Sequence, residues 1–132
     1  MLVFALLLSG IFAYSEYLDQ TTSKLSNKLS LLSETIEKDE WEMSLREISD
    51  LAKCWKKNEP ILAMFNDHED VDHIKISISE LKIYIEKQNQ EEALKTLAEA
   101  TIYLERIRKN ENLSLENVLS LTPVGLSCHI ML

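Results

Sequence analysis

Residues 29–55 read LSLLSETIEKDEWEMSLREISDLAKCW, and they contain two helical patterns separated by a short polar break. Before the break, Leu29, Leu32 and Ile36 recur at spacings of three and four, which is typical of one buried helix face. After the break the apolar positions again follow a helical period; they are Trp41, Leu45, Ile48, Ala52 and Trp55. The segment therefore predicts two helices joined by a tight turn, an αα-hairpin.

The break itself carries a helix-start signal. Asp39 is a favourable N-cap residue, and Glu42 follows three positions later, as in a capping box. We expect the second helix to end before Pro60, because the residue that precedes a proline avoids the helical conformation. Pro60 itself suits the first turn of a third helix.

The helical patterns continue on both sides of this hairpin. Leu18 and Leu25 extend the first stripe towards the N-terminus. A third helix is predicted from the stripe Ile61, Met64 or Phe65, His68, Val71, Ile74, Ile78, Leu81 and Ile85. A fourth helix, after a turn at Asn89, is predicted from Ala93, Leu97, Ala100, Leu104 and Ile107. We expect it to end at residues 110–112, with a short helix after Ser114.

The two halves of this pattern match at an offset of 49 residues. At that offset Leu29, Leu32, Ile36, Leu45 and Ile48 align with Ile78, Leu81, Ile85, Leu94 and Leu97. Helical patterns also align by chance, so both a duplicated hairpin and a coincidence remain open. Either way the sequence predicts an all-α fold: an N-terminal hydrophobic helix, then an antiparallel four-helix arrangement of two αα-hairpins in residues 18–120. Residues 121–132 are predicted to form an irregular tail.

The chain begins with an uncharged apolar run, MLVFALLLSGIFAY in residues 1–14. As a helix this run covers about 21 Å, short of the roughly 30 Å hydrocarbon core, and Ser15 and Tyr17 would extend it at the interface. A signal-anchor helix, a cleaved signal peptide and a buried core helix all fit such a run. We favour the first, with residues 1–17 as a membrane anchor.

The charges that flank this run bear on its orientation. No Lys or Arg precedes Lys24, so either the natural start lies further upstream or the anchor is unusual. The first charged residues, Glu16 and Asp19, are acidic, whereas cytoplasmic flanks usually carry Lys and Arg. We therefore expect a single-pass protein of the cell membrane with an extracytoplasmic helical domain.

Composition excludes several functions. A net charge of −8 over 132 residues argues against a nucleic-acid partner, which requires a basic surface. The two glycines, Gly10 and Gly125, cannot form a phosphate-binding glycine loop, and two cysteines do not make a disulfide framework. We expect no cofactor.

Residues 66–73, NDHEDVDH, are the most suggestive stretch for chemistry. His68 and Asp72 lie four residues apart, so they and His73 are candidate ligands for a divalent metal ion. The favoured interpretation is a core histidine at His68 beside a solvated acidic face, because a third ligand is available only at His129 in the tail. Cys54 has no His or acid in visible partnership, which leaves packing as its role. We expect no enzymatic activity.

Several short motifs resemble a known family. They are Asp39-Glu40-Trp41, Trp55, Asp67-His68-Glu69 with Asp72 and Ile74, Leu81-Lys82 with Tyr84-Ile85, and Leu113-Ser114-Leu115-Glu116-Asn117-Val118. Together they resemble the domain-of-unknown-function family 4363, small membrane-anchored helical proteins of Firmicutes, over residues 18–120. The resemblance implies a helical domain behind an N-terminal membrane segment and carries no functional residue.

These observations lead to two functional hypotheses. The first is a membrane-tethered helical interaction module, accessory to a multi-pass membrane protein. The alternative is a sensor of divalent metal or of a small ligand that uses the His68 region.

Overall fold

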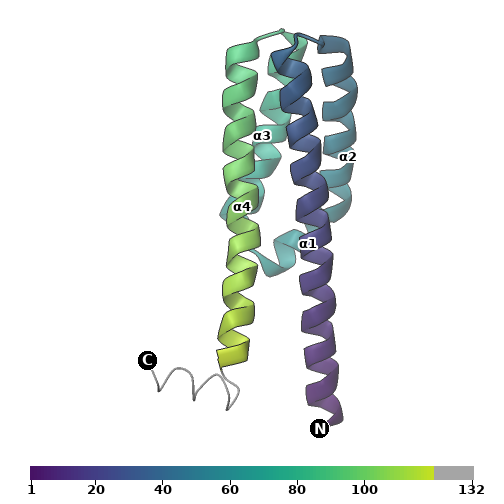
Figure 1. The fold of residues 1–132 in the computed structure, drawn as a ribbon, viewed down its shortest axis with the longest axis vertical. Helices are drawn as coiled ribbons and strands as arrows, with labels where there is room; N and C mark the ends of the chain where they lie inside the picture. Colours follow the sequence, from purple (N-terminus) through teal and green to yellow (C-terminus); the bar gives the residue numbers. More distant parts are fainter. Residues whose placement is uncertain (121–132) are drawn as a thin grey trace.

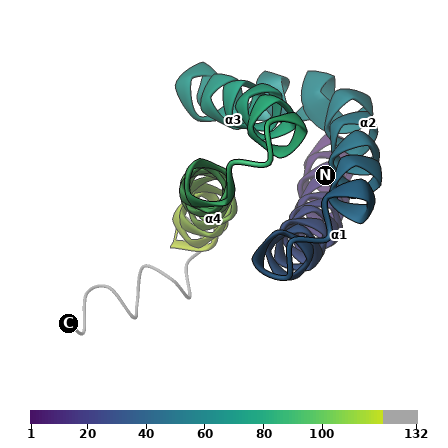
Figure 2. The ribbon, with the colours of Figure 1, turned by 90° about the horizontal axis from the view of Figure 1, so that it is seen from above.

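The computed structural model describes the backbone of residues 1–120 and the side chains of residues 1–109. This part of the chain forms four helices: α1 Leu2–Glu37, α2 Trp41–Phe65, α3 His68–Glu86 and α4 Gln90–Ser120. Each helix contacts the next one, and α1 also contacts α4, so the four enclose one core (Figure 1, Figure 2). The predicted all-α fold of two αα-hairpins is confirmed. The predicted tail, residues 121–132, lies outside the described residues.

The core is built from aliphatic side chains that all four helices contribute at helical spacing. Its members are Leu18, Leu25, Leu29, Leu32, Ile36, Ile48, Leu51, Trp55, Leu62, Val71, Ile74, Ile78, Leu81, Ile85, Ala93, Leu97, Ala100, Leu104 and Ile107. Burying one Leu or Ile side chain contributes about 1.5–3 kcal/mol, so these buried side chains together hold the two hairpins against each other.

The predicted anchor and the predicted first helix of the bundle form one continuous helix, α1. No proline interrupts residues 2–37, and the polar residues after Tyr14 tolerate the helical conformation. The first buried core residue of α1 is Leu18. The apolar segment is therefore a direct extension of a helix whose second half packs in the bundle.

The prediction that the second helix ends before Pro60 is wrong, because α2 continues through it to Phe65. Pro60 lies on the exposed side of the helix, where the backbone carbonyl that loses its partner can be hydrated. Leu62 is fully buried two residues later. Burial of Leu62 therefore outweighs the local preference for a break.

The core face of α2 is displaced from the predicted stripe. Ser44, Ile48, Leu51 and Trp55 are buried, whereas Leu45 is 38% exposed. Trp41, also predicted to be buried, is only half-buried against the core. Leu and Trp were assigned to the core by their hydrophobicity, but the small Ser44 faces α1, where its hydroxyl group donates to Thr35.

The turns of the two hairpins have the same geometry, 49 residues apart. In the first, the N–H groups of Asp39 and Glu40 donate to the carbonyls of Ile36 and Thr35. In the second, the N–H groups of Gln88 and Asn89 donate in the same way to Ile85 and Tyr84. Both turns are Schellman motifs.

The burial pattern follows the same offset. The core positions Leu25, Leu29, Leu32, Ile36, Ile48, Leu51 and Trp55 correspond to the core positions Ile74, Ile78, Leu81, Ile85, Leu97, Ala100 and Leu104. The predicted correspondence of Leu45 with Leu94 lies outside the core, since the buried pair there is Ser44 and Ala93. The two hairpins are thus a structural repeat.

The caps differ from the predicted ones. Asp39 has a positive φ of 57° within the turn, and Glu40, the residue that precedes α2, forms no side-chain cap. The capping box predicted for Asp39 and Glu42 is therefore wrong. Asp67 caps α3 by accepting a hydrogen bond from the N–H of Glu69, and α4 continues past residues 110–112 to Ser120.

Candidate functional site

The N-terminal part of α1 projects beyond the connection between α2 and α3 and has no helix packed against most of its surface (Figure 1). Its apolar side chains are exposed, from Leu2 at 80% to Phe12 at 60%. α1 is long and apolar enough to cross a membrane, and only 6% of its most apolar 18-residue stretch is buried within the protein. Its exposure contradicts the interpretation of this run as a buried core helix.

The connection between α2 and α3 is fixed to α1 where the apolar run ends. The ring of Tyr14 lies 4.4 Å from the ring of Phe65, and the Asn66 side chain donates to the Tyr14 hydroxyl group at 3.0 Å. Met64 is 75% exposed and Phe65 58% exposed at the same level. Met64 and Phe65 thus form an apolar patch at this end of the bundle, and the contacts of Tyr14 join this end to the apolar extension.

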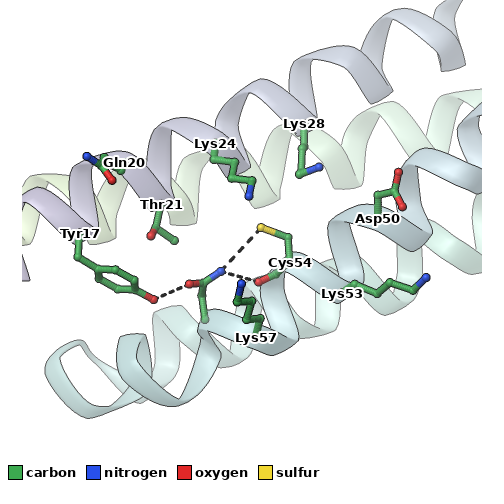
Figure 3. Close-up of a pocket in the computed structure, with 10 residues that line it drawn as sticks. Tyr17, Gln20, Thr21, Lys24, Lys28, Asp50, Lys53, Cys54 and Lys57 are labelled. Carbon is green, nitrogen blue, oxygen red and sulfur yellow. Dashed lines mark hydrogen bonds between the residues drawn. The ribbon is translucent and has the colours of Figure 1, made fainter.

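A groove of about 480 Å³ lies between α1 and α2, the two helices of the first hairpin (Figure 3). We call it the lysine groove; it is lined by Tyr17, Gln20, Thr21, Lys24, Lys28, Asp50, Lys53, Cys54, Lys57 and Asn58. Four of these residues are lysines and one is acidic. Their ammonium groups form no ion pair with any residue whose side chain the structure describes. The groove therefore carries excess positive charge in a protein of net charge −8.

Hydrogen bonds fix the floor of the groove at its end nearest the apolar segment. The Tyr17 hydroxyl group donates to the Asn58 side chain, which in turn donates to the Cys54 carbonyl at 2.7 Å (Figure 3). Asn58 also approaches the Cys54 sulfur at 3.8 Å. These contacts hold α1 and α2 together at this level, and the side chains of Lys24 and Lys28 extend from α1 towards α2 beside them (Figure 3).

The residues predicted as metal ligands do not converge. His68 and Asp72 are both exposed, and His68 stands at the start of α3 rather than on the core stripe. From Val71 onwards the predicted stripe is buried, but at the start of α3 the buried residue is Asp70 and not His68. The interpretation of His68 as a core histidine is therefore wrong. Among residues with described side chains, no three His, Cys, Asp or Glu groups are placed to hold a metal ion. His129 lies outside the described residues.

His73, the third predicted ligand, has a structural environment of its own. Its ring stacks on Tyr103 at 4.4 Å with an interplanar angle of 9°, and Glu69 lies 3.9 Å away. Arg106 lies 5.5 Å from the centre of the Tyr103 ring and pairs with the buried Asp70 at 3.4 Å. This cluster fills the seam between α3 and α4.

The lysine groove was not predicted from the sequence. Its signal was present as two pairs of lysines four residues apart, Lys24 with Lys28 and Lys53 with Lys57, each on one helix face. The antiparallel register that brings the two pairs to one groove depends on the turn at residues 38–40. Cys54, which was assigned to packing, lies half-buried between these pairs.

The fold and this geometry define a class: an antiparallel four-helix bundle whose first helix continues into an exposed apolar segment. The chain belongs to the family described as "Domain of unknown function (DUF4363)", whose model matches residues 12–118. The family predicted from the short motifs is thereby confirmed. No curated protein and no solved structure matches the chain.

Proposed function

We propose that this protein is a membrane-tethered helical interaction module, accessory to a multi-pass membrane protein. One observation carries the tether: most of the large apolar side chains between Leu2 and Phe12 are exposed, while one face of the same helix is buried in the bundle from Leu18 onwards. Exposed apolar area of this size is unfavourable in water and marks contact with lipid or with another protein. The exposed rim of Met64 and Phe65 at the same end fits an apposed bilayer surface.

Extraction of membranes at alkaline pH tests the tether. The full-length protein should remain in the membrane pellet, and a Leu6→Lys/Leu7→Lys variant should be released, because a charge at mid-membrane costs about 2.5–3.5 kcal/mol. A Ser9→Ala variant is the matched control and should remain in the pellet. Release of the unaltered protein would contradict the tether.

The bundle is proposed to be extracytoplasmic. Support comes from the charges next to the apolar run, Glu16 and Asp19, since positively charged flanks usually stay in the cytoplasm. A C-terminal tag should be digested when protease is added to intact cells. Protection of the tag until the membrane is permeabilised would place the bundle in the cytoplasm and contradict this orientation.

The partner is proposed to be another membrane protein. Ile76 and Ile83 are about half-exposed and lie two turns apart on α3, and Ile102 on α4 is 60% exposed. These apolar side chains offer contact points on the outer surface of the bundle, above the tether. Affinity purification from detergent-solubilised membranes should enrich one multi-pass protein, and an Ile76→Glu/Ile83→Glu variant should lose it. Repeated recovery of the protein alone would contradict a stable partner.

A further inference from the structure

The repeat provides an internal comparison for the lysine groove. With the offset of 49 residues, the seam between α1 and α2 corresponds to the seam between α3 and α4. In the second seam the half-buried ring of Tyr103 packs against the core, and His73 covers it by stacking on it. The residue that corresponds to Tyr103 in the first seam is Cys54, which is far smaller. The first seam is therefore open where the second one is filled.

The two seams also differ in charge: basic residues have acidic neighbours in the second seam and neutral neighbours at the corresponding positions of the first. In the second seam Arg106 is neutralised by the buried Asp70, and Glu69 lies beside His73. In the first seam Lys57 stands at the position of Arg106, and Lys24 at the position of His73. The positions of Asp70 and Glu69 are taken by Thr21 and Gln20, which are neutral. The first seam therefore has basic residues at the first two of these positions and neutral residues in place of both carboxylates.

Two further lysines increase this excess. Lys28 and Lys53 stand where the second hairpin has Ser77 and Ile102. Asp50 is the one acidic residue that lines the groove. Four lysines and one carboxylate along a groove give it a positive potential, which favours a bound anion.

We propose that the lysine groove binds a small polyvalent anion of the phosphate-ester class. A volume of about 480 Å³ lies within the usual range of small-molecule sites. Lysine binds phosphate oxygens as a point charge, and a polyvalent phosphate ester carries enough negative charge to interact with several of the four lysines at once, whereas a single carboxylate carries one charge. The Thr21 hydroxyl group forms no hydrogen bond with a described residue and can donate to such a ligand.

Phosphate groups could come from a soluble ester or from a lipid headgroup. Lys24 follows Tyr14 by ten residues, which is about 15 Å along a helix. A headgroup layer is roughly 5–8 Å thick on each side. If Tyr14 marks the membrane edge, as the proposed tether implies, Lys24 and Lys28 lie beyond the headgroups. A soluble ester is therefore the source that we favour.

Calorimetric titration of the full-length protein in detergent with sodium tripolyphosphate, at low ionic strength, tests the site. We expect saturable binding at one site. The Lys24→Gln/Lys57→Gln variant should bind at least about tenfold more weakly, because each lost contact between charges in water is worth about fivefold. The Lys38→Gln/Lys87→Gln variant removes the same charge at the turns and should bind within about twofold of the unaltered protein. Absence of saturable binding, or equal losses in both variants, would overturn the proposal.

A second variant copies the filled seam into the first hairpin. Thr21→Asp with Cys54→Tyr should abolish tripolyphosphate binding, while far-ultraviolet circular dichroism confirms that the bundle is folded. Thr21→Asp alone should weaken binding at least about fivefold by supplying the missing carboxylate. Unchanged affinity in folded Thr21→Asp protein would overturn the assignment to this groove. Tighter binding of a hexaglutamate peptide than of tripolyphosphate would overturn the phosphate class.

Nanodiscs distinguish the two phosphate sources. Affinity for tripolyphosphate should be the same in discs of phosphatidylcholine and in discs that also contain phosphatidylglycerol. Competition by phosphatidylglycerol that requires Lys24 and Lys57 would support the same anion site with a lipid as its occupant. The titration in detergent does not depend on the tether, so failure of either proposal leaves the other standing.

Discussion

Asp39 and Gln88 adopt the same left-handed backbone conformation, with φ of 57° and 54°, at corresponding positions of the two hairpin turns. Both are the residue that follows the last helical turn in a Schellman motif, where glycine is usual. The protein therefore places two side chains in a conformation that L-amino acids avoid. The geometry of the turns is set by the packing of the helices on either side of them.

Replacing Gln88 by glycine should stabilise the protein. The change removes the strain of a side chain at positive φ, and we expect a gain of about 0.5–1 kcal/mol in the free energy of unfolding. Lys87→Gly is the matched control: Lys87 has a φ of −85°, so glycine there should cost about 0.5–1 kcal/mol. Urea denaturation measures both. A loss of stability in Gln88→Gly would contradict the role assigned to this position.

Replacing Arg106 by glutamine should leave the carboxylate of Asp70 buried without its counter-charge. Asp70 is 2% exposed, whereas the Arg106 side chain is 58% exposed, which reduces the effect. We expect a loss of about 1–2 kcal/mol. A second substitution, Asp70→Asn, should restore most of this loss because the buried group is then neutral. A double-mutant cycle in urea measures the coupling, and additive effects would exclude an interaction between the two residues.

Replacing Trp55 by phenylalanine should cost less than other truncations in the core. The indole N–H of Trp55 is buried and has no hydrogen-bond partner among the described residues. Removing this donor recovers about 1–3 kcal/mol of desolvation cost and offsets much of the lost apolar contact. We expect a net loss below about 1 kcal/mol, against about 2–5 kcal/mol for Leu81→Ala. Thermal unfolding of both variants checks the ranking, and equal losses would show that the N–H group carries no penalty.

Replacing Pro60 by alanine should stabilise the protein. Pro60 lies inside α2, where it removes a backbone hydrogen bond. A proline in a helix interior costs about 3 kcal/mol, of which the exposed position and the reduced entropy of the unfolded chain recover part. We expect a gain of about 1–2 kcal/mol. Ser49→Ala, at another exposed position of α2, should change stability by about 0.5 kcal/mol or less. A loss of stability in Pro60→Ala would show that the helix needs the proline.

Most of the fold follows from the spacing of apolar residues. The stripes of Leu18 to Ile36, and of Ile74 to Ile85, are buried as their helical period predicts. The offset of 49 residues between the two hairpins is also visible in the sequence. These features depend on neighbours within one helix, which is why the sequence alone predicts them.

The candidate site was not predictable in the same way. The lysine groove depends on the antiparallel register of α1 and α2, and on the small size of Cys54 at the position where the second hairpin has Tyr103. Neither can be deduced from spacing within a single helix. The prediction of a core histidine at His68 is wrong for a related reason, because α3 begins at His68 and the first residues of the helix that are buried are Asp70 and Val71.

The sequence by itself determined the helices, the hairpin pattern and the uncharged apolar run of residues 1–14, because each depends on local composition and period. The tertiary structure decided where α2 ends, which face of it is buried and where the lysines meet. At Pro60 the local preference for a break gave way to the burial of Leu62, since contacts with other helices outweigh a penalty of a few kcal/mol. At Asp39 and Gln88 the same packing holds the backbone in a conformation that neither residue prefers.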